Sequence, residues 1–301
     1  MKEYIFICIA VILMSFQLVF SKLYQSKANC KNAALVFPLI TGVVAFILFF
    51  IISGFKIYYS SFSILMAFCG ALITTVFSLI GLKAVKEISV SIYSAFTMLG
   101  ALIIPFIYGV AVLREPLSPL MIVGVVVLVV ALVINAIEKG EQSKGYVKGI
   151  IYCLIVFTLN GVFGVLSKIH QINENAVDTS VFLQWITLFQ ALFSLIILII
   201  KIVIDNKNNK EIDADSPKFN VKSLVKPVLI GAGYSAFWGI GFYFQLIALK
   251  KLAVSIANPI VTGAVIVLSS VISSIIFKNK IKLKQICAYA IMVIGIVLFI
   301  L

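Results

Sequence analysis

Ten long apolar stretches alternate with short polar segments along this chain. Each stretch holds about 20 residues, the length that a helix needs to cross the hydrocarbon core of a bilayer. The segments between them carry clusters of Lys, Asp, Asn and Ser. The expected spans are residues 4–21, 33–53, 62–82, 90–113, 118–137, 147–167, 180–204, 226–248, 254–277 and 283–301. The pattern therefore predicts an all-α polytopic membrane protein with ten transmembrane helices.

One short pattern occurs twice. Ala84-x-Lys86-x-x-x-Val90-Ser91-Ile92 recurs 164 residues later as Ala248-x-Lys250-x-x-x-Val254-Ser255-Ile256. The first copy follows the third span and the second follows the eighth, so an odd number of spans separates them and they lie on opposite sides of the membrane. This indicates two inverted five-helix repeats, residues 1–145 and 146–301, a plan typical of secondary transporters whose substrate site lies between the halves.

Composition supports a membrane protein. Apolar residues make up 62% of the 301 residues and charged residues 12%, whereas soluble domains carry about a quarter charged residues. The five cysteines have no metal-binding spacing, so we expect no disulfide framework, no metal site and no cofactor. The apolar N-terminal run lacks a cleavage site, and we expect it to be retained as the first helix.

The net charge of +13 has two interpretations. One is nucleic-acid binding, and the other is that the loops carry lysines that set topology. We favour the second, because the cations are spread over short loops. Of the 24 Lys and Arg residues, 18 follow the odd-numbered spans and six lie on the other side. The positive-inside rule then places both termini outside an inner (plasma) membrane.

The residues around both copies carry a resemblance to a known family. They are Gly81-Leu82-Lys83-Ala84-Val85-Lys86, Val90-Ser91-Ile92, Arg114-Glu115-Pro116-Leu117 and Gly124, with Ile247-Ala248-Leu249-Lys250, Val254-Ser255, Pro259 and Gly295 in the second half. In this order and spacing the chain resembles the EamA-type, ten-helix transporters of the drug/metabolite transporter superfamily. The resemblance implies a cavity lined by helices 1, 3, 4, 6, 8 and 9. The chain departs from the family in two respects. Asn279 stands at the position that aligns with Glu115 in the second half. Family members are often drawn with both termini in the cytoplasm, whereas the lysine bias here places them outside.

No acidic residue falls inside an expected span. A carboxylate at membrane depth is the usual mark of a proton relay. The resemblance implies that small four-helix relatives exchange protons for cationic drugs through a Glu of the first helix. In this chain Met14 and Phe16 occupy that region. We therefore expect alternating access without a carboxylate relay, by facilitated diffusion or by coupling through an ion that the sequence does not identify.

Polar side chains inside the spans are the candidates for a substrate cavity. They suit a neutral, zwitterionic or amphipathic solute. The alternative for each is a hydrogen bond within its own helix or to a neighbouring one, worth about 0.6 kcal/mol; Asn and Gln are the more costly to bury unpaired. The candidates are Gln17, Thr74, Ser78, Tyr93, Thr97, Asn160, Trp238, Gln245, Asn258 and Thr262.

Charged and structural candidates form a second group. Lys22 and Lys168 stand at matching ends of helices 1 and 6, where they either meet a substrate carboxylate or snorkel to the interface. Gly231 and Gly239 with Ser235 form a smooth stripe typical of close helix packing. Pro105 and Pro259 lie inside spans and predict kinks or hinges, and Glu115 ends the first unit.

These observations predict a transporter rather than an enzyme. The single histidine, His170, is expected in a loop, which leaves no material for Ser-His catalysis or a histidine metal site. The predicted function is an exporter or facilitator of small metabolites, such as amino acids or aromatic and amphipathic solutes. The alternative is a flippase for a lipid or a lipid-linked sugar. The expected partners are the lipid bilayer and a small-molecule substrate, with no nucleic acid, and the protein would act as a monomer or homodimer.

Overall fold

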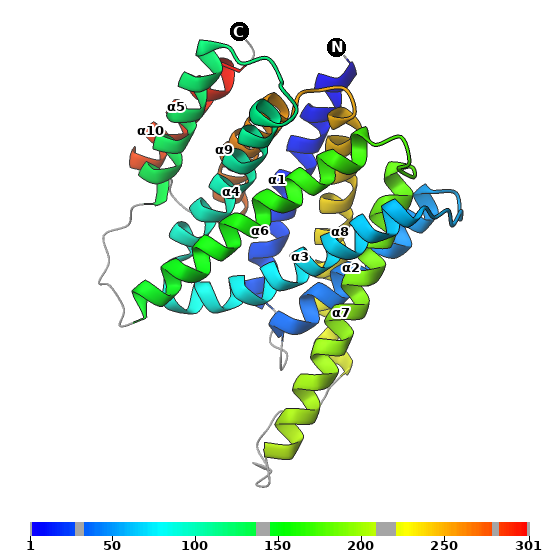
Figure 1. The fold of residues 1–301 in the computed structure, drawn as a ribbon. Coiled ribbons are helices and arrows are strands. Elements are labelled where there is room, and N and C mark those ends of the chain that lie inside the picture. Colours follow the sequence, from blue (N-terminus) through cyan, green and yellow to red (C-terminus); the bar gives the residue numbers. More distant parts are fainter. Residues whose placement is uncertain (1, 28–32, 137–144, 209–220, 279–282, 300–301) are drawn as a thin grey trace.

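The described residues of the protein form a bundle of ten α helices. A computed structural model describes residues 2–27, 33–136, 145–208, 221–278 and 283–299, and all regular secondary structure in this part of the chain is helical (Figure 1). The helices are α1 (Lys2–Lys27), α2 (Ala33–Ile52), α3 (Ser61–Glu87), α4 (Val90–Ala111), α5 (Pro119–Ala136), α6 (Tyr146–Ile172), α7 (Thr179–Asn208), α8 (Val221–Leu249), α9 (Val254–Phe277) and α10 (Leu283–Val297).

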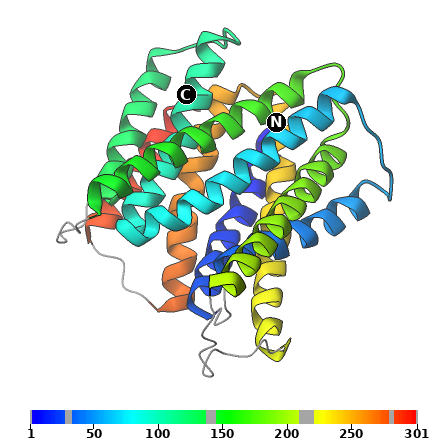
Figure 2. The same ribbon diagram turned by 60° about the horizontal axis from the view of Figure 1, so that its bottom comes forward.

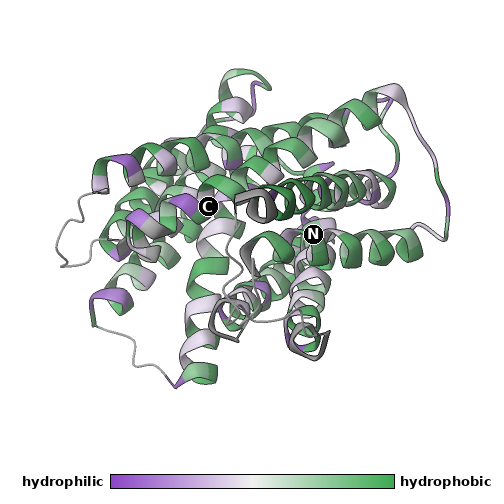
Figure 3. Ribbon diagram, turned by 90° about the horizontal axis from the view of Figure 1, so that it is seen from below, coloured by the Kyte–Doolittle hydropathy of each residue, from purple (hydrophilic) through white to green (hydrophobic). Residues whose placement is uncertain are grey.

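Most of these helices suit a bilayer by length and composition. Among the described residues, seven helices are long and apolar enough to cross a membrane, and α5 and α10 hold shorter apolar segments. α8 is not among the seven, because Gly, Tyr, Ser and Trp replace aliphatic residues in its middle. Figure 3 shows apolar ribbon along most of the helices, with polar residues concentrated toward the helix ends. The prediction of an all-α polytopic membrane protein is confirmed.

The helices of the two halves pair in a symmetric way. α1 packs on α8 and α9, and its counterpart α6 packs on α3 and α4; α2 and α7 contact each other, as do α4 and α9, and α5 and α10. If each helix is replaced by the helix five places away in the chain, the same set of contacting pairs results; the α1–α8 pair, for example, becomes the α6–α3 pair. In Figure 1, α1 runs down from the end marked N, whereas α6 runs up toward that end. Figure 2 presents the same arrangement after a 60° turn. α1 and α6 thus run in opposite directions, and the two inverted five-helix repeats, residues 1–145 and 146–301, stay a prediction.

Both copies of the repeated pattern lie where a half makes its tightest turn. The first joins α3 to α4 and the second joins α8 to α9. Ala84 and Ala248 are both fully buried. Ser89 caps α4 by accepting a hydrogen bond from the backbone N–H of Ile92, at 3.4 Å, which satisfies one of the free donors at a helix start.

Glycines set the closest helix crossings. A Cβ atom on Gly124 of α5 would lie 3.1 Å from the carbonyl oxygen of Gly295 on α10, and a Cβ on Gly295 would lie 3.3 Å from that of Gly124. Gly124 lies in the first turns of α5 and Gly295 in the last turn of α10. Larger residues there would force α5 and α10 apart.

Candidate functional site

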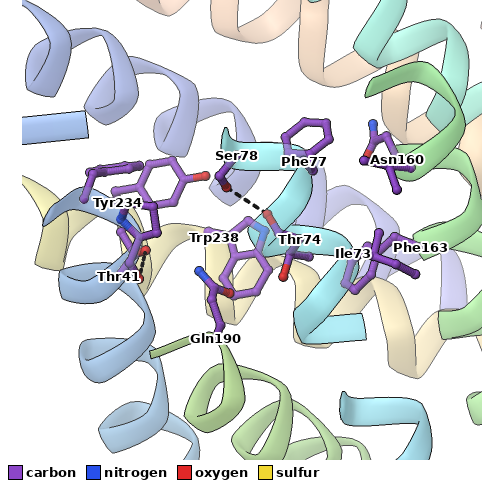
Figure 4. Close-up of a pocket in the computed structure, with 13 residues that line it drawn as sticks. Thr41, Ile73, Thr74, Phe77, Ser78, Asn160, Phe163, Gln190, Tyr234 and Trp238 are labelled. Atoms are coloured by element: carbon purple, nitrogen blue, oxygen red, sulfur yellow. Dashed lines mark hydrogen bonds between the residues drawn. The ribbon is translucent and has the colours of Figure 1, made fainter. Parts of the chain in front are cut away.

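A cavity of about 160 Å³ lies between α2, α3, α6, α7 and α8 (Figure 4). Its walls combine aromatic and aliphatic side chains with a small number of uncharged polar groups. Such a mixture is typical of small-molecule sites, in which a few polar groups fix the orientation of a mostly apolar ligand. The lining residues are Phe37, Pro38, Thr41, Ile73, Thr74, Phe77, Ser78, Leu159, Asn160, Phe163, Gln190, Tyr234 and Trp238.

Three hydroxyl groups in the cavity donate hydrogen bonds within their own helices. Ser78 Oγ donates to the carbonyl oxygen of Thr74 at 2.9 Å, and Thr74 Oγ1 donates to that of Ala71 at 3.1 Å. Thr41 Oγ1 donates to the carbonyl oxygen of Pro38 at 3.2 Å. The oxygen lone pairs of these side chains remain as acceptors, so this wall can receive hydrogen bonds from an ammonium, hydroxyl or amide group of a solute.

Asn160 joins the cavity to the neighbouring helix. Its Nδ2 donates to the carbonyl oxygen of Thr97 on α4 at 2.8 Å. This bond fixes the amide so that its oxygen remains as an acceptor. Figure 4 places Asn160 on the opposite side of the cavity from Tyr234 and Thr41.

Aromatic rings close two sides of the cavity. Phe37 and Tyr234 meet edge to face at 4.8 Å between ring centroids. Trp238 stacks on Phe242 at 5.5 Å, and Phe163 stacks on the same ring at 5.6 Å. We call Phe163, Trp238 and Phe242 the aromatic floor. Flat apolar surfaces of this kind favour an aromatic or amphipathic solute.

Four of the ten polar candidates from the sequence line this cavity: Thr74, Ser78, Asn160 and Trp238. The other six are not among its lining residues. Gln17 is buried in α1, and Thr97 Oγ1 donates to the carbonyl oxygen of Tyr93 within α4 at 3.0 Å. The Tyr93 side chain packs beside Ala84 and Cys153, with its hydroxyl facing Gly81 of α3. Gln245, Asn258 and Thr262 are buried on α8 and α9.

The set of lining helices differs from the one that the resemblance implies. α3, α6 and α8 contribute as expected, but α2 and α7 replace α1, α4 and α9 in the wall. α1 is packed between α8 and α9, and its Ser15 Oγ reaches the carbonyl oxygen of Val265 at 3.4 Å. The sequence offered a signal for α7, since Gln190 is a polar residue in an apolar run. Tyr234 is one turn from Trp238, which was a signal for α8.

A second polar group closes the end of the bundle at which α1 begins. Lys168 Nζ donates to the carbonyl oxygens of Leu249 and Leu252, both at 2.8 Å, at the end of α8. Glu115 accepts the backbone N–H groups of Val254 and Ser255, both at 2.8 Å, at the start of α9. The lysine and the carboxylate are 4.0 Å apart, and their side chains are only 7% and 10% exposed. We call this Lys168–Glu115 pair the clamp.

The local backbone explains how Glu115 turns inward. Arg114 adopts a left-handed φ of 54° after the end of α4, and the backbone N–H of Glu115 donates to the carbonyl oxygen of Gly109 at 3.0 Å. Gly109 has no side chain where the carboxylate passes; any Cβ there would collide with it. A carboxylate at a helix N-terminus is also favoured by the helix dipole. The residue aligned with Glu115, Asn279, lies outside the described residues.

Neither lysine candidate is a cavity residue. Lys168 is buried in the clamp rather than extended to the interface, because the carbonyl groups ending α8 and Glu115 supply its partners. Lys22 is exposed; its Nζ donates to Ser273 Oγ at 3.3 Å and lies 4.4 Å from the centre of the Phe277 ring. The matching positions therefore differ in environment, which sequence symmetry did not reveal.

His170 lies in the last turn of α6 rather than in a loop, so this expectation was wrong. Its ring is 1% exposed, its Nε2 is 3.0 Å from Ser63 Oγ, and it stacks on Phe182 at 3.5 Å between centroids. α6 extends to Ile172 because this turn packs against α3 and α7. The group ties three helices together.

The remaining structural candidates sit at helix contacts. Pro105 faces Gly164 of α6, and Pro259 is buried within α9. Gly231 faces Ile40 of α2, and Gly239 faces Leu48 and Phe49 of the same helix. Between the two glycines, Ser235 Oγ donates to the carbonyl oxygen of Thr41 at 2.7 Å. The small-residue stripe of α8 thus brings α2 close beside the cavity.

Comparisons with known proteins address the fold and the family. Residues 147–301, slightly more than half of the chain, match the EamA-like transporter family. No curated protein matches the sequence. A solved structure described as "Crystal structure of protein" is similar, with a TM-score of 0.74 and 18% sequence identity, over 100% of this chain and 98% of that one. At this identity the likeness concerns the fold alone.

Proposed function

Because the chain belongs to the EamA-like transporter family, we propose that it is an exporter or facilitator of small metabolites such as amino acids or aromatic and amphipathic solutes. The observation that carries the proposal is the cavity with uncharged polar groups on some walls and aromatic rings on others. Its acceptors suit the ammonium or hydroxyl of a solute, and its rings suit an apolar side chain.

The size of the cavity favours a small solute over a lipid. Its volume of about 160 Å³ is below the roughly 300–1,000 Å³ of typical ligand pockets. A metabolite of a few heavy atoms needs only a modest expansion of this space. A lipid or a lipid-linked sugar needs a much larger one.

Movement between the two halves provides the transport step. The cavity draws on helices from both halves, and the clamp holds their contact at one end of the bundle. Rocking the halves exposes the cavity to one side of the membrane and then to the other. None of the described residues that line the cavity is acidic, which supports a step without a carboxylate proton relay.

We place both termini outside an inner (plasma) membrane, from the lysine bias of the loops. The clamp lies at the end where α1 begins, because Lys251 of the α8–α9 turn pairs with Glu3 at 3.7 Å. The clamp is then the outer closure. Reporters active only inside or only outside the cell, fused to the C-terminus, measure this orientation; a signal from inside refutes it.

The transport test uses proteoliposomes and a panel of radiolabelled amino acids, with and without a pH gradient. We expect saturable uptake of one or more neutral or aromatic members, independent of the gradient. Asn160→Leu removes the cavity amide and should lower this uptake about tenfold. Thr158→Val, on the exposed face of the same helix, is the matched control and should leave uptake unchanged. Strict dependence on the pH gradient contradicts the uncoupled mechanism, and flipping of a fluorescent lipid with no solute uptake contradicts the substrate class.

A further inference from the structure

Three buried polar atoms have no partner in the region between the cavity and the clamp. Among the described residues, they are Ser167 Oγ, Gln245 Oε1 and Ser255 Oγ, whose residues are 1%, 8% and 0% exposed. Burying a polar atom unpaired costs about 1–3 kcal/mol. Three such atoms in one region require an explanation.

The helix periods place these atoms on the extension of the cavity wall. Ser167 follows Asn160 by seven residues on α6, and Gln245 follows Trp238 by seven on α8. Seven residues make about two turns, so both lie on the cavity-facing side, roughly 10 Å further along. Both helices run on from there to the clamp, at Lys168 and Leu249.

α9 contributes further polar side chains at the depth of Ser167 and Gln245. Asn258 Oδ1 accepts a hydrogen bond from Gln245 Nε2 at 3.2 Å, and Asn258 faces Gly164 of α6. Ser255 is one turn earlier on α9, and its backbone N–H is held by Glu115. We call Ser167, Gln245, Ser255 and Asn258 the polar layer. Phe163 and Phe242 of the aromatic floor come one turn before Ser167 and Gln245 on their helices, and the clamp follows at Lys168 and at the backbone N–H of Ser255.

We propose that the polar layer is a second solute-binding site, reached from the clamp end of the bundle, which takes a hydrogen-bond donor such as an ammonium, hydroxyl or amide N–H. Gln245 donates one N–H to Asn258, and its oxygen, which has no partner, is left to accept. The serine hydroxyls supply two further acceptors but can also donate, so the selectivity for a donor solute rests on the Gln245 oxygen. The inference rests on the proposed transport function, in which a solute leaves the cavity past the aromatic floor and meets this site when the clamp opens.

The test measures chemical access rather than transport. Ser255→Cys is made in a full-length chain whose five native cysteines are replaced by alanine. The clamp is left intact or neutralised by Glu115→Gln with Lys168→Met, which removes both charges. Two reagents of similar size are used, 2-aminoethyl and 2-sulfonatoethyl methanethiosulfonate, and their rates are divided by their rates with free cysteine. The first carries a donor ammonium and the second an acceptor sulfonate.

We expect the aminoethyl reagent to react with the cysteine about tenfold faster when the clamp is neutralised, and about tenfold faster than the sulfonatoethyl reagent, as one charge-assisted hydrogen bond implies. Gln245→Leu removes the acceptor and should abolish that preference. The matched control is Ala257→Cys, at the same depth of α9 in the apolar core, which should stay unreactive.

Three results overturn the proposal. The first is that, with the clamp neutralised, a cysteine at position 255 reacts as slowly as one at position 257. The second is that the two reagents react at equal rates. The third is that the preference for the aminoethyl reagent remains after Gln245→Leu. If the double variant is not monodisperse, Glu115→Gln alone repeats the access measurement, because its amide oxygen still accepts from α9. A transport panel without any substrate contradicts the proposed function but leaves these rates unaltered, so the two failures are distinguishable.

Discussion

Replacing Lys168 by methionine tests whether the clamp stabilises the protein. Methionine keeps most of the length of the side chain but removes the ammonium that donates to the carbonyl oxygens of Leu249 and Leu252 at 2.8 Å. The Glu115 carboxylate then stays buried without a cation. Removing one partner of a buried pair costs about 3–5 kcal/mol, and we expect a loss of stability of this size.

A double-mutant cycle with Glu115→Gln separates the ion pair from the helix capping. At 4.0 Å, two unit charges interact by about 4 kcal/mol in an effective dielectric of about 20, which bounds the coupling from above. Each side chain also makes short hydrogen bonds to backbone atoms that the cycle does not count as coupling. The double variant should therefore lose about 2–4 kcal/mol less than the sum of the single variants.

Thermal unfolding of the detergent-purified protein provides the assay. At about 2–4 °C per kcal/mol for a chain of this class, Lys168→Met should lower Tm by on the order of 10 °C. Lys250→Met is the matched control, because Lys250 is exposed at the adjacent α8–α9 turn, and its Tm should be unchanged. Single variants whose losses simply add would refute the interaction between Lys168 and Glu115, and an unchanged Tm for Lys168→Met would refute the stabilising role.

Three further predictions concern the cavity and the packing. Trp238→Ala should raise the transport KM about two- to tenfold more for aromatic than for aliphatic solutes, since aromatic contacts contribute about 0.5–1.5 kcal/mol; equal effects on both classes contradict a stacking role. Gly124→Ile should destabilise the α5–α10 contact by about 1–3 kcal/mol in thermal unfolding, and a KM change without loss of Tm argues against packing. His170→Ala removes the Ser63 bond and the Phe182 contact, so Tm should fall with KM unaltered, and a KM shift at constant Tm would give His170 a transport role.

Much of the fold was predictable because a helix that lies in a membrane is recognisable from its own stretch of apolar residues. Backbone groups in a bilayer must pair within their own helix, so apolar runs of sufficient length specify helices directly. The ten helices followed from this rule, and among the described residues seven of them are long and apolar enough to cross a membrane. The helix ends were harder to place: α6 continues through His170 to Ile172, because packing against α3 and α7 extends it beyond its apolar run.

The cavity was predictable only in part. Thr74, Ser78, Asn160 and Trp238 stood out as polar residues in apolar runs, and they line it. Gln245 met the same criterion, yet it lies behind the aromatic floor. A polar residue in a span signals that it avoids lipid, but not which buried surface it contacts. The aromatic and aliphatic residues of the wall, such as Phe37 and Ile73, carry no signal at all, because apolar side chains also face lipid and core.

The sequence by itself determined the helices, the family resemblance and the repeated pattern, because hydrophobic length, residue identity and spacing are properties of the chain. Only the tertiary structure decided the partners of Lys168 and Glu115, which are 53 positions apart in the sequence and meet at the junction of α8 and α9. It also decided that Lys22, the sequence counterpart of Lys168, lies exposed against α9 instead. A charged side chain in a membrane protein is stabilised by the groups around it, and helix packing brings those groups together.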